Sequence, residues 1–101
     1  VPSSTPAAPL TYQMAQNVPN PFNPETVIAF STPRAGRVRL VVYDVAGRTV
    51  RRLLDEQRPP GEYRVRWNGR GDDGRAMPSG HYYYRLELGS DVLTRTMVLL
   101  K

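Results

Sequence analysis

Residues 62–67 alternate strictly between charged and apolar side chains. The apolar positions are Tyr63, Val65 and Trp67, and the charged positions are Glu62, Arg64 and Arg66. Successive side chains of a β-strand point to opposite sides. The pattern therefore predicts a half-buried strand with one dry face and one solvated face.

Residues 80–88 repeat this arrangement after a loop rich in glycine and aspartate. One face carries Tyr82, Tyr84, Leu86 and Leu88, and the other carries His81, Tyr83, Arg85 and Glu87. The apolar faces of the two predicted strands are large and aromatic. We therefore expect them to form the centre of a small hydrophobic core.

Four further runs have the composition of strands: residues 26–31, 37–44, 48–54 and 94–101. Within the second run, Val38, Leu40 and Val42 are expected to face inward. The third run is less regular and fits either a β-bulge or one turn of helix.

Six strands joined by short turns predict an all-β fold, an antiparallel immunoglobulin-like β-sandwich of six or seven strands. A seventh strand is expected around Val92 or within residues 73–78. The last run is apolar on both faces, so it is expected to lie at a sheet edge or to be exposed for strand addition by a partner.

The first sixteen residues differ in composition from the rest. Residues 1–16 are rich in proline, serine, threonine and alanine, which predicts a linker from an upstream domain. Residues 17–101 are then one domain. Asparagines and prolines in residues 17–24 predict turns, and Phe22 is expected to plug one end of the sandwich. An exposed recognition peptide is less favoured, because it would forfeit roughly 1.5–3 kcal/mol of burial.

The composition restricts the function classes. The chain of 101 residues has no cysteine, no apolar run long enough for a membrane helix and no signal peptide, and it begins without methionine, as a fragment or processed form would. Its formal charge is +5. Seven basic or aromatic residues occupy strand positions whose side chains are expected to point away from the core. They are Arg37, Arg39, Arg64, Arg66, Arg85, Tyr43 and Tyr83.

If their strands are neighbours, these residues form one basic stripe. It is either a solvated face with cross-strand pairs to Glu62 and Glu87 or a surface for an anionic glycan. The residues assigned to glycan contact are Tyr43, Tyr83, Arg64 and Arg66. No nucleic-acid partner is expected, because the arginines are spread over several strands without a dense run.

The motifs for catalysis or metal binding are weak. His81 is the only histidine, so a catalytic base would lack a partner. A calcium loop starting at Asn68 would place Arg70 at a ligand position and Ser79 at the twelfth. The tripeptide 70–72 spells Arg-Gly-Asp, a match that arises easily by chance. We expect no enzyme, no metal and no cofactor.

Several motifs together resemble a known family. They are residues 17–26 (NVPNPFNPET), 42–48 (VYDVAGR), 67–69 (WNG), 78–86 (PSGHYYYRL) and 95–101 (RTMVLLK). Their order and spacing resemble type A C-terminal sorting domains of the bacterial type IX secretion system, and the module is similar to the Ig-like domain of flagellar hook-capping proteins. The motif positions with a structural role are Asn20, Pro21, Phe22, Asn23, Pro24, Asp44, Gly47, Arg48, Trp67 and Gly69.

This resemblance implies a non-catalytic signal that directs an upstream cargo domain through the periplasm of a Gram-negative bacterium to the cell surface or medium. The implied partners are the outer-membrane secretion machinery, a sortase-like peptidase and an anionic lipopolysaccharide. The implied signal residues are Gly80, Tyr82, Tyr84, Arg95, Met97, Val98, Leu99, Leu100 and Lys101. His81 and Tyr83 depart from the family pattern. A carbohydrate-binding accessory module and a passive Ig-like spacer remain as alternatives.

Overall fold

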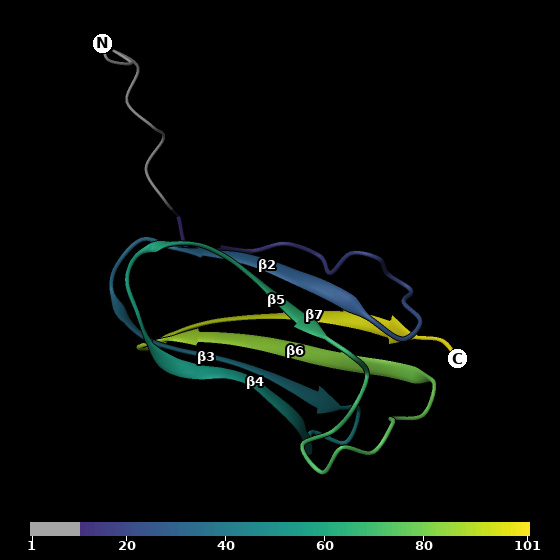
Figure 1. Ribbon diagram of the computed structural model, residues 1–101. Coiled ribbons are helices and arrows are strands. Elements are labelled where there is room, and N and C mark those ends of the chain that lie inside the picture. The colour runs from purple at the N-terminus through teal and green to yellow at the C-terminus, as the bar shows by residue number, and fades with distance from the viewer. Residues whose placement is uncertain (1–10) are drawn as a thin grey trace.

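The computed structural model describes residues 11–101, which form two packed antiparallel sheets (Figure 1). The strands are β1 (Gln13–Met14), β2 (Thr26–Thr32), β3 (Gly36–Asp44), β4 (Thr49–Arg58), β5 (Gly61–Trp67), β6 (Gly80–Leu88) and β7 (Asp91–Leu99). The described residues contain no helix that could cross a membrane. The predicted immunoglobulin-like β-sandwich is confirmed.

The sheets have the orders β1-β2-β5 and β4-β3-β6-β7. Two hairpins, β3–β4 and β6–β7, stay within the four-stranded sheet, whereas β5 pairs with β2 in the other sheet. The seventh strand is β1, not one of the two regions expected from the sequence. Val92 belongs to β7, and residues 73–78 contribute only the isolated bridge of Ala76 to Arg70.

The predicted alternation places the core correctly. Tyr82, Tyr84, Leu86 and Leu88 are all buried, as are Val38, Leu40 and Val42. Trp67 lies among aromatic rings, with centroids 5.5 Å from Phe22 and 5.6 Å from Tyr82. Its indole nitrogen donates a 2.9 Å hydrogen bond to the Arg70 carbonyl, so its polar atom is satisfied inside the core.

The β4 strand is longer than the sequence indicated and is irregular in its pairing with β3. Its register shifts between Leu40 and Val41 and again between Val42 and Tyr43. Of the two possibilities left open for residues 48–54, the structure therefore has bulges and no helical turn. Bulges of this kind increase the local twist of a strand and disturb its free edge.

The sequence analysis placed the start of the domain at residue 17, but the packed structure begins earlier in the chain. Met14 is buried and pairs with Phe30, and Gln13 pairs with Ser31. Tyr12 also packs against the core. The composition of this stretch suggests a linker, but β2 supplies a strand edge that orders it. The linker prediction for residues 1–10 lies outside the described residues.

Candidate functional site

The β7 strand borders the four-stranded sheet, and residues 12–22 run along its free edge. The Phe22 amide donates to the Val98 carbonyl at 3.0 Å, and the Leu100 amide donates to the Phe22 carbonyl at 2.9 Å. The Val98 amide donates to Asn20 Oδ1 at 3.0 Å. Figure 1 shows the end of β7 beside the segment that leads into β2. These bonds satisfy backbone groups that a bare edge would leave open.

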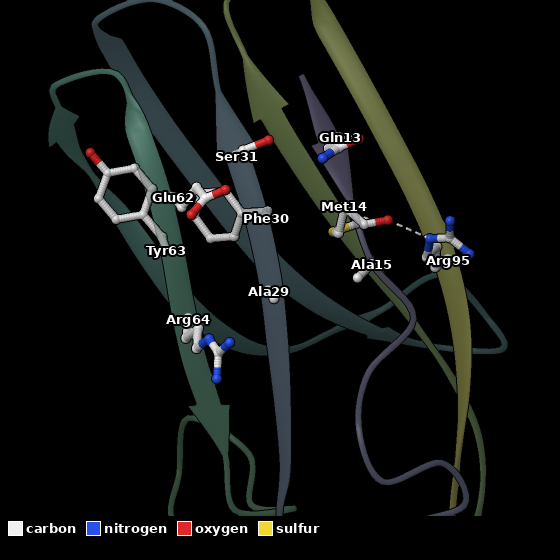
Figure 2. Close-up of a pocket in the computed structure, with 10 residues that line it drawn as sticks. All are labelled: Gln13, Met14, Ala15, Ala29, Phe30, Ser31, Glu62, Tyr63, Arg64 and Arg95. Carbon is white, nitrogen blue, oxygen red and sulfur yellow. Dashed lines mark hydrogen bonds between the residues drawn. The ribbon is translucent and has the colours of Figure 1, made fainter. Parts of the chain in front are cut away.

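The same segment contacts β7 farther from its end. Gln16 Nε2 donates to the Thr96 carbonyl at 2.7 Å. Arg95 Nε donates to the Met14 carbonyl at 2.6 Å, the bond drawn in Figure 2. Residues 12–22 therefore close this side of the sandwich along most of the length of β7.

Tyr12 fastens the start of this segment to the β6–β7 hairpin. Its hydroxyl lies 2.6 Å from the Leu86 carbonyl and 3.0 Å from the Asp91 carbonyl. Burial raises the pKa of Tyr12 to about 12, with added repulsion from the carboxylates of Asp91 and Glu87. The neutral phenol is thus the form that the folded domain holds.

The contacts of residues 20–24 and 67–69 explain directly what these residues do in the fold. Phe22 is 1% exposed and plugs the end of the core against Trp67, as predicted. Gly69 has φ of +77°, and a Cβ there would lie 2.9 Å from the Pro24 carbonyl oxygen. Only glycine fits that conformation and that close approach.

Residues 44–48 form the β3–β4 turn. Asp44 Oδ1 accepts hydrogen bonds from the amides of Ala46 and Arg48, both at 2.9 Å, and Arg48 Nε lies 3.0 Å from Asp44 Oδ2. The bond from the Arg48 amide is the main cause that lowers the pKa of Asp44 below its ordinary value. Gly47 provides the positive φ of the turn. This motif is explained by hairpin geometry.

The residues assigned to the sorting signal divide into buried and exposed groups. Tyr82, Tyr84, Met97 and Leu99 are buried, Gly80 and Val98 are partly buried, and Arg95, Leu100 and Lys101 are exposed. The buried side chains cannot touch a partner while the sandwich is folded. They hold in place the strands that carry the exposed residues of this set.

The two buried tyrosines fix neighbouring segments of the chain through their hydroxyl groups. The Tyr82 hydroxyl donates to the Pro78 carbonyl at 2.6 Å, pinning the loop that enters β6. The Tyr84 hydroxyl accepts the Asn17 amide at 2.9 Å and donates to the Ala15 carbonyl at 3.0 Å. Burial is the first cause of the raised pKa of both phenols. No pattern in the sequence indicated that Tyr84 anchors residues 15–17.

The predicted basic stripe is wrong, because its strands belong to different sheets. Arg64 and Arg66 lie on β5 in the three-stranded sheet, whereas Tyr43 and Tyr83 are paired on β3 and β6 of the other. The four residues assigned to a glycan therefore do not form one surface. The alternation of side chains along each strand identified its outward face correctly, but it could not indicate to which sheet the strand belongs.

On the four-stranded sheet, Arg37 and Arg39 form ion pairs with neighbouring acidic side chains. Arg37 and Arg39 approach Asp55 at 2.7 and 3.8 Å, and Arg39 also lies 3.9 Å from Glu87. The Arg85 guanidinium carbon lies 4.7 Å from the centre of the Tyr43 ring, a cation–π contact.

A shallow groove of about 580 Å³ lies on the three-stranded sheet (Figure 2). Its lining includes small side chains of Ala15, Ala29 and Ser31. Its charged residues are Glu62, Arg64 and Arg95, which come from β5 and β7. None of these three forms an ion pair within residues 11–101.

The glycine-rich loop after β5 is folded against β4. Asp72 Oδ1 accepts the Arg52 amide at 3.1 Å, the Asp72 amide donates to the Val50 carbonyl at 2.9 Å, and Gly71 is buried. The backbone of the Arg-Gly-Asp tripeptide is thus held against β4, while the side chains of Arg70 and Asp72 are exposed. Across residues 11–101, no group of three histidine, cysteine or acidic side chains is placed to hold a metal ion.

Comparison with solved structures finds PorZ of Porphyromonas gingivalis, described as an essential bacterial surface component of the type-IX secretion system. The match has 22% sequence identity and a TM-score of 0.56, and it covers 85% of this chain and 11% of PorZ. At this identity the likeness shows the fold alone.

No curated protein matches the chain. Among family models, that of the FlgD Ig-like domain matches residues 16–91, which include β2 to β6 in full and only the first residue of β7. The matched span covers more than half of the chain. The chain therefore belongs to the FlgD Ig-like domain family.

Proposed function

We propose that this domain is a non-catalytic sorting signal, which directs an attached cargo across the outer membrane to the cell surface or medium. The observation that carries the proposal is the construction of β7. Its buried residues fix the strand in the core, while Leu100 and Lys101 stand exposed just beyond it. A secretion machine can therefore read these side chains on a rigid and defined backbone.

Two further findings support this role. The all-β immunoglobulin-like fold suits a binding module better than an enzyme, and the structurally similar PorZ is a component of the type-IX secretion system. We propose the outer-membrane machinery of that system and a sortase-like peptidase as partners, with anionic lipopolysaccharide as an attachment target. The domain would then act in a Gram-negative bacterium after passage through the periplasm.

The test is a secretion assay with residues 1–101 fused behind a reporter that carries an export signal. Hosts with and without a type IX system are compared. Removing residues 97–101 would delete buried Met97 and Leu99 and so confound recognition with folding. Substituting Leu100→Ser together with Lys101→Gln avoids this, because both residues are exposed.

Val92→Ser is the matched control. Val92 lies near the start of β7 and is 50% exposed, and Leu100 follows the end of β7 and is 49% exposed. We expect system-dependent export of the parent fusion, strong loss with the Leu100–Lys101 substitutions and little change with Val92→Ser. Urea unfolding of each variant checks that the sandwich is retained. Equal export in both hosts would support a passive spacer, and equal export of all variants would remove Leu100 and Lys101 from the signal.

A further inference from the structure

The free sheet edges of this sandwich are protected unequally. Residues 12–22 cover the edge of β7, and two bulges interrupt the pairing of β4. In contrast, β5 pairs with β2 in unbroken register over all seven residues, from Gly61 opposite Thr32 to Trp67 opposite Thr26. Within residues 11–101, no strand pairs with its other side. A regular, uncovered edge is a template for another strand.

The charges on β5 are also left without partners. Glu62 and Arg64 project from the outer face of β5, as Figure 2 shows. Among residues 11–101, Glu62 is the one acidic side chain outside any ion pair, and Arg64 likewise forms none. Arg66 differs, because its Nε lies 3.7 Å from Glu25 Oε2. The open edge therefore carries one free charge of each sign, two residues apart.

We propose that β5 binds the β5 strand of a second copy of this chain, antiparallel and with Tyr63 on the two-fold axis. The two three-stranded sheets then join into one sheet of twice the width. This places Glu62 of each copy opposite Arg64 of the other, giving two identical ion pairs. Gly61 faces Val65 in the same register.

Symmetry limits the registers to be considered. Two antiparallel copies of one strand are related by a two-fold axis perpendicular to the sheet, so the axis passes through a residue that faces its own copy. An axis at Arg64 sets two arginines opposite each other, and an axis at Val65 sets Arg64 opposite Arg66 twice. An axis at Glu62 opposes two carboxylates. Of these positions, only an axis at Tyr63 sets opposite charges across from each other without also setting like charges across from each other.

This self-association goes beyond the sorting role and does not depend on it. Its test is the molar mass of residues 1–101 by light scattering and sedimentation equilibrium, from roughly 20 µM to 1 mM chain, the range suited to a short interface. We expect a concentration-dependent monomer–dimer equilibrium. A monomer throughout that range would overturn the proposal.

Charge reversal tests the register. Arg64→Glu opposes carboxylates across the axis, and Glu62→Arg opposes guanidinium groups, so each should raise the dimer Kd at least about tenfold. The double variant Glu62→Arg, Arg64→Glu restores opposite charges and should return the Kd to within about threefold of the parent. Arg85→Glu, on the other sheet, is the control and should leave the Kd unchanged. A dimer insensitive to both reversals, or not restored by the double variant, would refute this register.

Discussion

Two of the four border strands, β7 and β5, leave backbone groups on their outer side that need partners, and they differ in how these groups are met. Along β7, the carbonyls of Thr96 and Val98 and the amides of Val98 and Leu100 are bonded by residues 12–22. Along β5, the described residues provide no such cover, and exposed Glu62, Arg64 and Arg66 alternate with partly or fully buried neighbours. One border is closed by the chain itself, and the other is left unpaired with exposed charged side chains along it.

The difference shows which border the fold depends on. Closing β7 also inserts Phe22 into the core beside Trp67 and ties Asn17 to Tyr84. The charged face of β5 contributes little burial, because its side chains stay in water. Substitutions on the β7 side should therefore cost stability, whereas those on the outer face of β5 should chiefly change association.

The largest effect is expected for Phe22→Ala, which empties the plug at the closed border. Truncating a buried phenylalanine costs about 3–5 kcal/mol of unfolding free energy, a large share of the stability of a small domain. Urea unfolding measures the loss. Val18→Ala is the control, since Val18 is 69% exposed on the same segment, and it should change stability by less than about 0.5 kcal/mol. Similar values for the two variants would contradict the plug.

Tyr84→Phe should have the next largest effect. It leaves the Asn17 amide and the Ala15 carbonyl without their buried partner, at a cost of about 1–3 kcal/mol. Hydrogen exchange at Asn17 should accelerate with the loss of stability. Tyr83→Phe is the matched control on the outward face of the same strand. An unprotected Asn17 amide in the parent protein would show that this anchor is not formed.

High pH should loosen the closed border through Tyr12. Below pH 10 its phenol is protonated in both states, so its stabilising contribution is complete. As pH rises from 10 towards 12, the unfolded chain loses the proton first, and the folded domain loses stability. Unfolding at several pH values measures the slope, which Tyr12→Phe should reduce. An unchanged slope in this variant would place the alkaline sensitivity elsewhere, as in Tyr82 or Tyr84.

The smallest effect on folding is expected at β5. Glu62→Gln removes a charge without an ion-pair partner in the described residues and should change the unfolding free energy by no more than about 0.5 kcal/mol. The measurement is made at a concentration where the parent is monomeric. A loss above about 1 kcal/mol would show that Glu62 supports the monomer, and the contrast between the two borders would then fail.

The local pattern was sufficient for much of the fold. Strict alternation in residues 62–67 and 80–88 identified two central strands and their buried faces, because a strand repeats every two residues. The burial of Phe22 also followed from residue chemistry. These features depend on near neighbours in the chain or on the size of one apolar side chain.

The residue pattern therefore identified six of the seven strands and the dry face of the central ones, but it missed β1. It could not indicate that β5 leaves the sheet of β3 and β6, that Arg64 and Tyr43 lie on different faces, or that residues 12–22 complete the edge of β7. The physical reason is that side-chain parity is a local property, whereas strand partners are chosen by contacts between segments as far apart as Asn17 and Tyr84.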